Sequence, residues 1–150
     1  YTGEENGTID RLLDMTGLSD FRDRFPYELS GGMQQRAGIC RALVRNPRIL
    51  LMDEPFGALD ALTRERMNLE LQRIWQSSGK TVMLITHSIS EAVFLGDRVI
   101  VMSARPGRIV ADLKVNIERP RSLDSIISDP EYSRLTREIR SLLNAQGEVD

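Results

Sequence analysis

Residues 29–60 read LSGGMQQRAGICRALVRNPRILLMDEPFGALD, and the rest of the chain is interpreted outward from this stretch. A Ser-Gly-Gly turn opens a helical segment, an apolar run ends in the carboxylates of Asp53 and Glu54, and a second turn ends in Asp60. Each piece alone is a weak indication, because short motifs match by chance. Their order and spacing together make a specific pattern.

The composition is that of an ordinary globular domain. Of 150 residues, 41% are hydrophobic and 28% are charged, and a chain of this length buries roughly 68–70% of its unfolded surface. The net charge of −2 argues against a nucleic-acid binder that relies on a basic surface. Cys40 is the only cysteine, so no internal disulfide can form, which suits a reducing cytoplasm.

Nothing in the sequence has the pattern of a membrane segment. No apolar run approaches the ~20 residues that a spanning helix needs, and residues 1–10 show no signal-peptide pattern. If a membrane is involved, we expect another chain to supply the spanning part.

Alternating helical and strand patterns predict an α/β fold. Residues 1–8 are expected to be a loose lead-in, with helices over 9–15, 30–46, 60–78, 90–95 and from 129 onward. Strands are expected over 49–52, 81–86, 99–102 and 109–115, the first buried on both faces of a parallel sheet and the last two joined as a hairpin. The helix over 60–78 is expected to bury Leu62, Met67, Leu71, Ile74 and Trp75.

Asp53 and Glu54 close the first apolar run. Ligands of open α/β sheets bind beyond the carboxyl ends of the strands, so both carboxylates are candidates for a site. One carboxylate could hold Mg²⁺ while the next polarises an attacking water. The competing interpretation is a strand that simply ends in acidic turn residues, and the pair alone does not decide between them.

His87, the only histidine, follows the second strand directly. Its two ring nitrogens could bond a nucleotide's terminal phosphate and Glu54. From its position alone, an ordinary core or surface histidine is the more common case. Its place at a strand end, matching that of the carboxylate pair, favours the functional role.

Ser30, Gly31 and Gly32 place a hydroxyl and unobstructed backbone N–H groups at a helix N-terminus. Unpaired donors and the helix dipole both favour an anion there, so the turn is a candidate phosphate cradle. The alternative is a plain N-cap followed by flexible glycines, and such caps are much more common than phosphate sites.

Taken together, these motifs resemble the second half of the ATPase subunit of ABC transporters. The resemblance assigns residues 29–36 to the signature motif, 49–54 to the Walker B strand, 57–60 to the D-loop and His87 to the switch histidine, and it covers at least residues 9–108. The amino-acid sequences of residues 33–36, 56–64 and 103–108 resemble those of the importer branch for nitrate, sulfonate, taurine or bicarbonate.

The resemblance implies a role for each matched residue. Ser30, Gly31 and Gly32, together with Gln34, would bind ATP held by the opposite subunit of a head-to-tail dimer. Asp53 would bind Mg²⁺ through water, Glu54 would be the general base or would position the water, and His87 would sense the γ-phosphate. Asp60 would couple the two sites across the dimer. Ser88 stands where many relatives carry Asp, a difference expected to matter little.

The same resemblance implies a partial P-loop NTPase fold, in three layers, with a mostly parallel sheet and part of the helical subdomain. We expect residues 1–46 to belong to that helical signature subdomain, 47–118 to the catalytic α/β core, and 119–150 to form a C-terminal helical segment. The implied partners are a second ATPase subunit, a membrane-spanning permease and, indirectly, a substrate-binding protein. The implied place is the cytoplasmic face of the plasma membrane.

One departure from the family pattern is the P-loop. Gly79-Lys80-Thr81 resembles its end, but the first glycine of that motif would fall at Ile74, and the context is helix–turn–strand. The chain therefore resembles a fragment, for which we expect very weak ATP binding, no hydrolysis on its own and a tendency to self-associate.

Two other classes of function share parts of this pattern. ABC-type ATPases of DNA repair and chromosome organisation share the signature and the Asp-Glu pair, but they carry heptad coiled coils beside it, and residues 1–28 show none. A non-catalytic regulatory domain remains open, although the presence of Glu54 and His87 argues against it.

Overall fold

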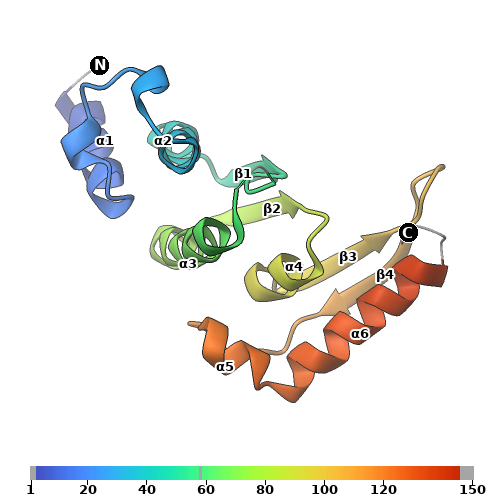
Figure 1. The fold of residues 1–150 in the computed structure, drawn as a ribbon. Coiled ribbons are helices and arrows are strands. Elements are labelled where there is room, and N and C mark those ends of the chain that lie inside the picture. Colours follow the sequence, from blue (N-terminus) through green and yellow to red (C-terminus); the bar gives the residue numbers. More distant parts are fainter. Residues whose placement is uncertain (1–2, 58, 146–150) are drawn as a thin grey trace. The chain divides into compact units, whose positions relative to one another are not determined.

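Helices and strands follow one another along the chain in the order shown in Figure 1. The computed structural model describes residues 3–57 and 59–145. The chain divides into two units, the first ending at Ile85 and the second beginning at Thr86. Each unit has its own two-stranded sheet.

The first unit contains η1 (Ser19–Phe21), η2 (Pro26–Glu28), the helices α1 (Gly3–Met15), α2 (Gly31–Val44) and α3 (Ala61–Ser78), and the strands β1 (Ile49–Asp53) and β2 (Thr81–Ile85). The second unit contains the helices α4 (Ile89–Leu95), α5 (Leu123–Ile127) and α6 (Pro130–Ala145), and the strands β3 (Arg98–Met102) and β4 (Ile109–Lys114). All the helices and strands expected from the sequence are present, and the short helix α5 is an addition.

The helices α1 and α2 share a small core in the first unit. Thr16, directly after α1, donates its Oγ1 hydrogen to the carbonyl of Leu12 at 2.8 Å and lies 3.2 Å from the sulfur of Cys40 on α2. Arg36 of α2 donates Nη1–H to the carbonyl of Thr16 at 2.8 Å. The end of α1 is thereby tied to α2 at two points.

The expectation of a loose lead-in is wrong for residues 3–8, because α1 already begins at Gly3. A helix nucleated by packing further along the chain propagates cheaply toward its N-terminus. Residues 1–2 lie outside the described part of the chain.

The strands β1 and β2 pair in parallel, with Ile49 opposite Thr81 and Asp53 opposite Ile85. Figure 1 shows α3 as the connection between them. Burial on both faces of β1 was expected, and that expectation is wrong. Leu50 and Met52 are buried, whereas Ile49 is 61% and Leu51 71% exposed. Alternate side chains of a strand point to opposite faces, and a single crossover helix covers only one face.

The helix α3 is defined at both ends by its sequence. Asp60 is its N-cap, and Gly79 ends it in the left-handed region at φ 61°, where glycine carries no steric penalty. Met67, Leu71 and Ile74 are buried, as expected. Leu62 was expected beside them but is 69% exposed. It lies five residues before Met67, which at about 3.6 residues per turn puts it on the other side of the helix.

The second unit is built on an antiparallel hairpin. β3 and β4 pair with Arg98 opposite Lys114, and a register shift occurs between Val101 and Met102. The amphipathic helix α6 packs its apolar side on this hairpin and on α4. The resulting core consists of Val93, Val99, Val101, Val115, Leu135 and Ile139.

The parallel pair β1–β2 with its crossover helix confirms the expected α/β fold class, and the hairpin is also confirmed. The three-part division at residues 46 and 118 stays a prediction. Within the described residues, no helix is long and apolar enough to cross a membrane.

Candidate functional site

The Ser-Gly-Gly turn forms the N-terminus of α2. Ser30 has an extended backbone, and its Oγ accepts a hydrogen bond from the N–H of Met33 at 3.3 Å. A Cβ at Gly31 would meet nothing within 4 Å, whereas a Cβ at Gly32 would lie 3.2 Å from the Cγ2 methyl of Thr63. Gly32 therefore allows α2 and α3 to approach closely, and Gly31 leaves the backbone open to a ligand.

Gln34 does not line the same space. Its Nε2 donates to the carbonyl of Pro26 at 2.8 Å and to that of Leu29 at 3.1 Å. The side chain thus reaches back from α2 to the segment before Ser30. In this structure Gln34 fixes the entry to the helix rather than facing a ligand.

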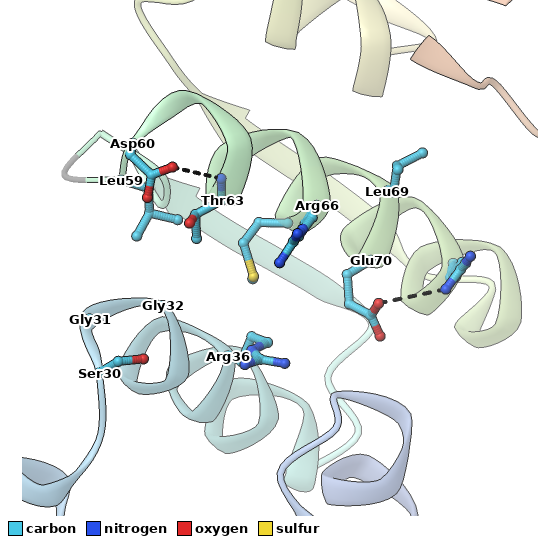
Figure 2. A pocket seen from close by; sticks show the side chains of 12 residues that line it. Ser30, Gly31, Gly32, Arg36, Leu59, Asp60, Thr63, Arg66, Leu69 and Glu70 are labelled. Atoms are coloured by element: carbon cyan, nitrogen blue, oxygen red, sulfur yellow. Dashed lines mark hydrogen bonds and ion pairs between the residues drawn. The ribbon is translucent and has the colours of Figure 1, made fainter. Parts of the chain in front are cut away.

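Ser30, Gly31, Gly32 and Asp60 line one cavity of about 730 Å³ between α2 and α3, seen in Figure 2. Asp60 accepts a hydrogen bond from the N–H of Thr63 at 3.0 Å. The hydrogen bonds from Thr63 lower the pKa of Asp60 from its ordinary value of 3.8. The other lining residues are Arg36, Leu59, Thr63, Arg66, Met67, Leu69, Glu70 and Arg73.

The lining of this cavity favours an anion. The side chains of Arg36, Arg66 and Arg73 outnumber the carboxylates of Asp60 and Glu70, and Glu70 is paired with Arg73 at 3.8 Å. Guanidinium groups near a helix N-terminus suit phosphate or carboxylate. Neither Arg36 nor Arg66 was predicted as a site residue, because their place in this cavity depends on how α2 and α3 pack.

The carboxylate pair lies at the end of β1, outside this cavity. Asp53 and Glu54 are both exposed, and Glu54 has a positive φ of 44°, which is uncommon for a residue other than glycine. Its N–H donates to the carbonyl of Ile85 at 2.8 Å, and its own carbonyl accepts from Gly57 at 3.2 Å. Glu54 thus begins a tight turn at the carboxyl end of the parallel sheet.

Two side chains from the flanking helices hold the turn that Glu54 begins. Gln35 of α2 donates Nε2–H to the carbonyl of Pro55. Arg64 of α3 donates Nε–H to the carbonyl of Phe56 at 3.4 Å and Nη2–H to that of Leu59 at 3.0 Å. The ring of Phe56 is 1% exposed and anchors the turn in the interior. Neither contact could be predicted from local sequence patterns.

His87 belongs to the second unit, is exposed and directly precedes the N-cap of α4. Ser88 is that N-cap: its Oγ accepts from the N–H of Glu91 at 3.3 Å, while its own N–H donates to Thr86 Oγ1 at 3.0 Å. Ser and Asp are both favoured N-caps, so Ser88 can cap this helix as well as the Asp that many relatives carry at this position.

A buried arginine holds the other end of α4. Arg121 is 2% exposed, and its Nη1 donates to the carbonyls of Val93, Phe94 and Gly96 at 3.0, 2.9 and 2.8 Å. Its Nε and Nη2 donate to the carbonyl of Ile117 at 3.2 and 2.9 Å. Burial lowers the pKa of Arg121 to about 10, still well above neutral pH. A cation at a helix C-terminus also complements the helix dipole.

Solved structures with this fold are ATP-binding cassettes. An ATP-binding cassette of an ABC transporter matches with a TM-score of 0.68 and 26% identity, covering 89% of this chain and 50% of that one. A dimeric bacterial ABC transporter cassette matches with a TM-score of 0.62 and 38% identity, covering 79% of this chain and 50% of that one. The fold is therefore part of the P-loop NTPase fold of ABC ATPases.

The family model described as ABC transporter matches residues 2–57 of this chain. The chain is 54% identical to a taurine import ATP-binding protein of Rhizobium johnstonii over 89% of this chain. It is 42% identical to a nitrate import ATP-binding protein of Synechococcus elongatus over 95% of this chain. Both of these relatives are named as import ATP-binding proteins, in agreement with the importer resemblance found in the sequence. The chain spans about half of each relative, 53% and 52%.

Proposed function

We propose that the intact protein is the ATP-hydrolysing subunit of an ABC importer for a small anion such as taurine, a sulfonate, nitrate or bicarbonate. One observation carries the proposal. The signature turn Ser30–Gly32 and the D-loop Asp60 line one cavity, whereas Asp53 and Glu54 lie outside it. This separation supports two half-sites in each subunit that serve two different nucleotides in a head-to-tail dimer.

In the first half-site, the N-terminus of α2 binds the terminal phosphate of ATP held by the other subunit. The backbone N–H groups at Gly31 and Gly32 and the Ser30 hydroxyl donate to the phosphate oxygens. The neighbouring guanidinium groups of Arg36 and Arg66 add positive charge to the cavity. Gln34 supports the turn from behind through its bonds to Pro26 and Leu29.

In the second half-site, Glu54 positions a water for in-line attack on the γ-phosphate and accepts a proton from it, and ADP and inorganic phosphate are released. Asp53 fits as a Mg²⁺ ligand, because this ion typically takes one or two carboxylates, substrate phosphates and waters. Among the described residues, no group of three or more His, Cys, Asp or Glu could hold a metal by itself. When bound, Mg²⁺ would neutralise charge on the phosphates.

His87 is proposed to sense the γ-phosphate, and Asp60 to couple the two sites across the dimer. A membrane-spanning permease would receive the motion at the cytoplasmic face, and a separate binding protein would deliver the anion. The names of the taurine and nitrate import relatives support this substrate class.

The decisive test is Glu54→Gln in the full-length protein. Loss of the general base is expected to lower kcat by a factor on the order of 10²–10³. The affinity for Mg-ATP, measured by calorimetry, should be nearly unchanged, because the amide has the size of the carboxylate. Wild-type turnover in the variant would contradict the proposed role of Glu54.

The substrate class needs its own measurement. The full-length protein would be reconstituted with its permease in proteoliposomes, and ATP hydrolysis followed as binding protein loaded with taurine, nitrate or bicarbonate is added. Stimulation by one of these anions would support the proposal. Stimulation only by a solute that carries no anionic group would overturn the assignment.

A further inference from the structure

The turn that follows β1 holds Glu54 in an unfavourable backbone conformation. At φ 44° the Cβ of a non-glycine residue crowds its own backbone, so this conformation persists only when surrounding contacts impose it. The residue in this conformation is not a glycine. It is Glu54, whose side chain is expected to contact the attacking water. The contacts that hold the turn therefore set where that carboxylate points.

Gln35 is the one described side chain of α2 that bonds this turn. Its Nε2 donates to the carbonyl of Pro55, the residue next to Glu54. Its Oε1 is buried and has no hydrogen-bond partner among the described residues. A buried acceptor without a partner is costly. The presence of Gln35 at this position therefore costs stability, because its Oε1 is buried without a partner. This cost points to a role of the Gln35 side chain other than packing.

The position of Gln35 on α2 matters as much as its bond. Ser30 caps the same helix only five positions earlier, within the first two turns. An α-helix moves nearly as a rigid body over so short a distance, so a shift of its N-terminus is carried to the Gln35 amide. The bond to Pro55 then passes that shift to the turn of Glu54.

We propose that Gln35 is a positioning residue that couples the two half-sites of a subunit. This inference rests on the proposed function. A phosphate bound at Ser30 fixes the N-terminus of α2, Gln35 transmits this to the carbonyl of Pro55, and Glu54 is thereby aligned on the other nucleotide. Each subunit would then hydrolyse its own ATP efficiently only when the partner's ATP is also bound, which makes hydrolysis cooperative.

Two observations separate this role from that of the neighbouring side chains. Arg64 also bonds the turn, but it comes from α3 and has no part in the N-terminus of α2. Gln34 shares α2 with Gln35 but bonds the carbonyls of Pro26 and Leu29, in the segment before Ser30. Gln35 alone among them joins the signature helix to the carboxylate turn.

The test is Gln35→Met in the full-length protein, which keeps the length of the side chain but removes the donor and the unpartnered acceptor. We expect kcat to fall about tenfold through loss of alignment. The Hill coefficient for ATP should fall from above 1 to 1, and the affinity for Mg-ATP should change less than about twofold. The matched control is Gln76→Met on the exposed side of α3, which should change none of these values.

A second measurement does not depend on turnover. Hydrogen exchange at the N–H groups of Glu54 and Gly57 would be compared with and without a non-hydrolysable ATP analogue. The analogue should slow exchange in the wild type and leave it unchanged in Gln35→Met. Equal slowing in both proteins would overturn the coupling, even if the variant proved less stable.

Other outcomes are equally decisive. A wild-type protein with a Hill coefficient of 1, or a Gln35→Met variant with wild-type kcat and cooperativity, would overturn the inference while Glu54→Gln remained inactive. Full activity of Glu54→Gln would instead refute the proposed function itself. The two failures are therefore distinguishable.

Discussion

Each of the two units contains a candidate site residue, Glu54 in the first and His87 in the second, and different contacts hold the neighbouring backbone in each. In the first unit, Gln35 and Arg64 are both partly exposed and hold the turn of Glu54 by donating to the carbonyls of Pro55, Phe56 and Leu59. In the second unit, α4, which follows His87, is held by the fully buried Arg121 on several carbonyls. We expect the first set of contacts to open more readily than the second, because partly exposed groups can exchange a protein partner for water.

The two units also differ in how far the outer strand faces are covered, since Ile100 and Met102 of β3 are 43% and 52% exposed. The second unit encloses Val93 and Leu135 completely, at 0% exposure. In the first unit, the outer side chains of β1 and β2, such as Leu51 and Met83, are exposed at 71% and 59%. Exposed apolar strand faces contribute little to stability. We infer that the second unit is the more stable of the two, and the following predictions test that difference.

The largest effect is expected for Arg121→Met. Removing the guanidinium leaves buried carbonyls at the end of α4 without their donor, which should cost about 3–5 kcal/mol. Hydrogen exchange in the intact protein would show faster exchange throughout β3 and β4, and the first unit should be unchanged. Arg140→Met, an exposed change on α6, serves as the control. Wild-type protection from hydrogen exchange in Arg121→Met would refute the proposed role of Arg121 in holding the end of α4.

An intermediate effect is expected for Arg64→Met in the first unit. Two hydrogen bonds to the turn are lost, but the carbonyls of Phe56 and Leu59 can turn toward water, so the cost should be about 1–2 kcal/mol. The faster exchange should be confined to the turn, at Gly57 in particular. Arg41→Met on the exposed side of α2 is the control. If Arg64→Met instead lost protection from hydrogen exchange in both units, the inferred difference in stability between the two units would be wrong.

The smallest effect is expected at Asp60, the exposed N-cap of α3. Its pKa is lowered by the hydrogen bonds from Thr63. A carboxylate with a lowered pKa contributes stability above its ordinary value of 3.8, and that contribution is lost as the pH falls through the lower folded pKa. Asp60→Ala should lower Tm slightly at neutral pH, and the difference from wild type should vanish in acid. Asp60→Ser keeps the cap without the charge and should show a smaller, pH-independent change.

The limits of sequence-based prediction are visible in particular residues. Ser30, Asp60 and Gly79 were recognised as helix boundaries because caps act on backbone groups within three or four positions. The β3–β4 hairpin was recognised for the same reason, since its turn lies between two adjacent apolar runs. Leu62 was wrongly predicted to be buried. Helical spacing shows which residues share a side of the helix, but only the packing of the helix decides which side is buried.

The sequence by itself determined the order of the elements, the two capped helices, and the identity of Ser30, Asp53, Glu54 and His87 as candidates. Only the tertiary structure decided that Ser30 and Asp60 share a cavity that excludes the carboxylate pair. It also decided that Gln35 holds Pro55 and that Arg121 holds α4, across 20 and 28 positions. The physical reason is range: caps and turns satisfy neighbouring backbone groups, whereas these contacts exist only because separate elements pack together.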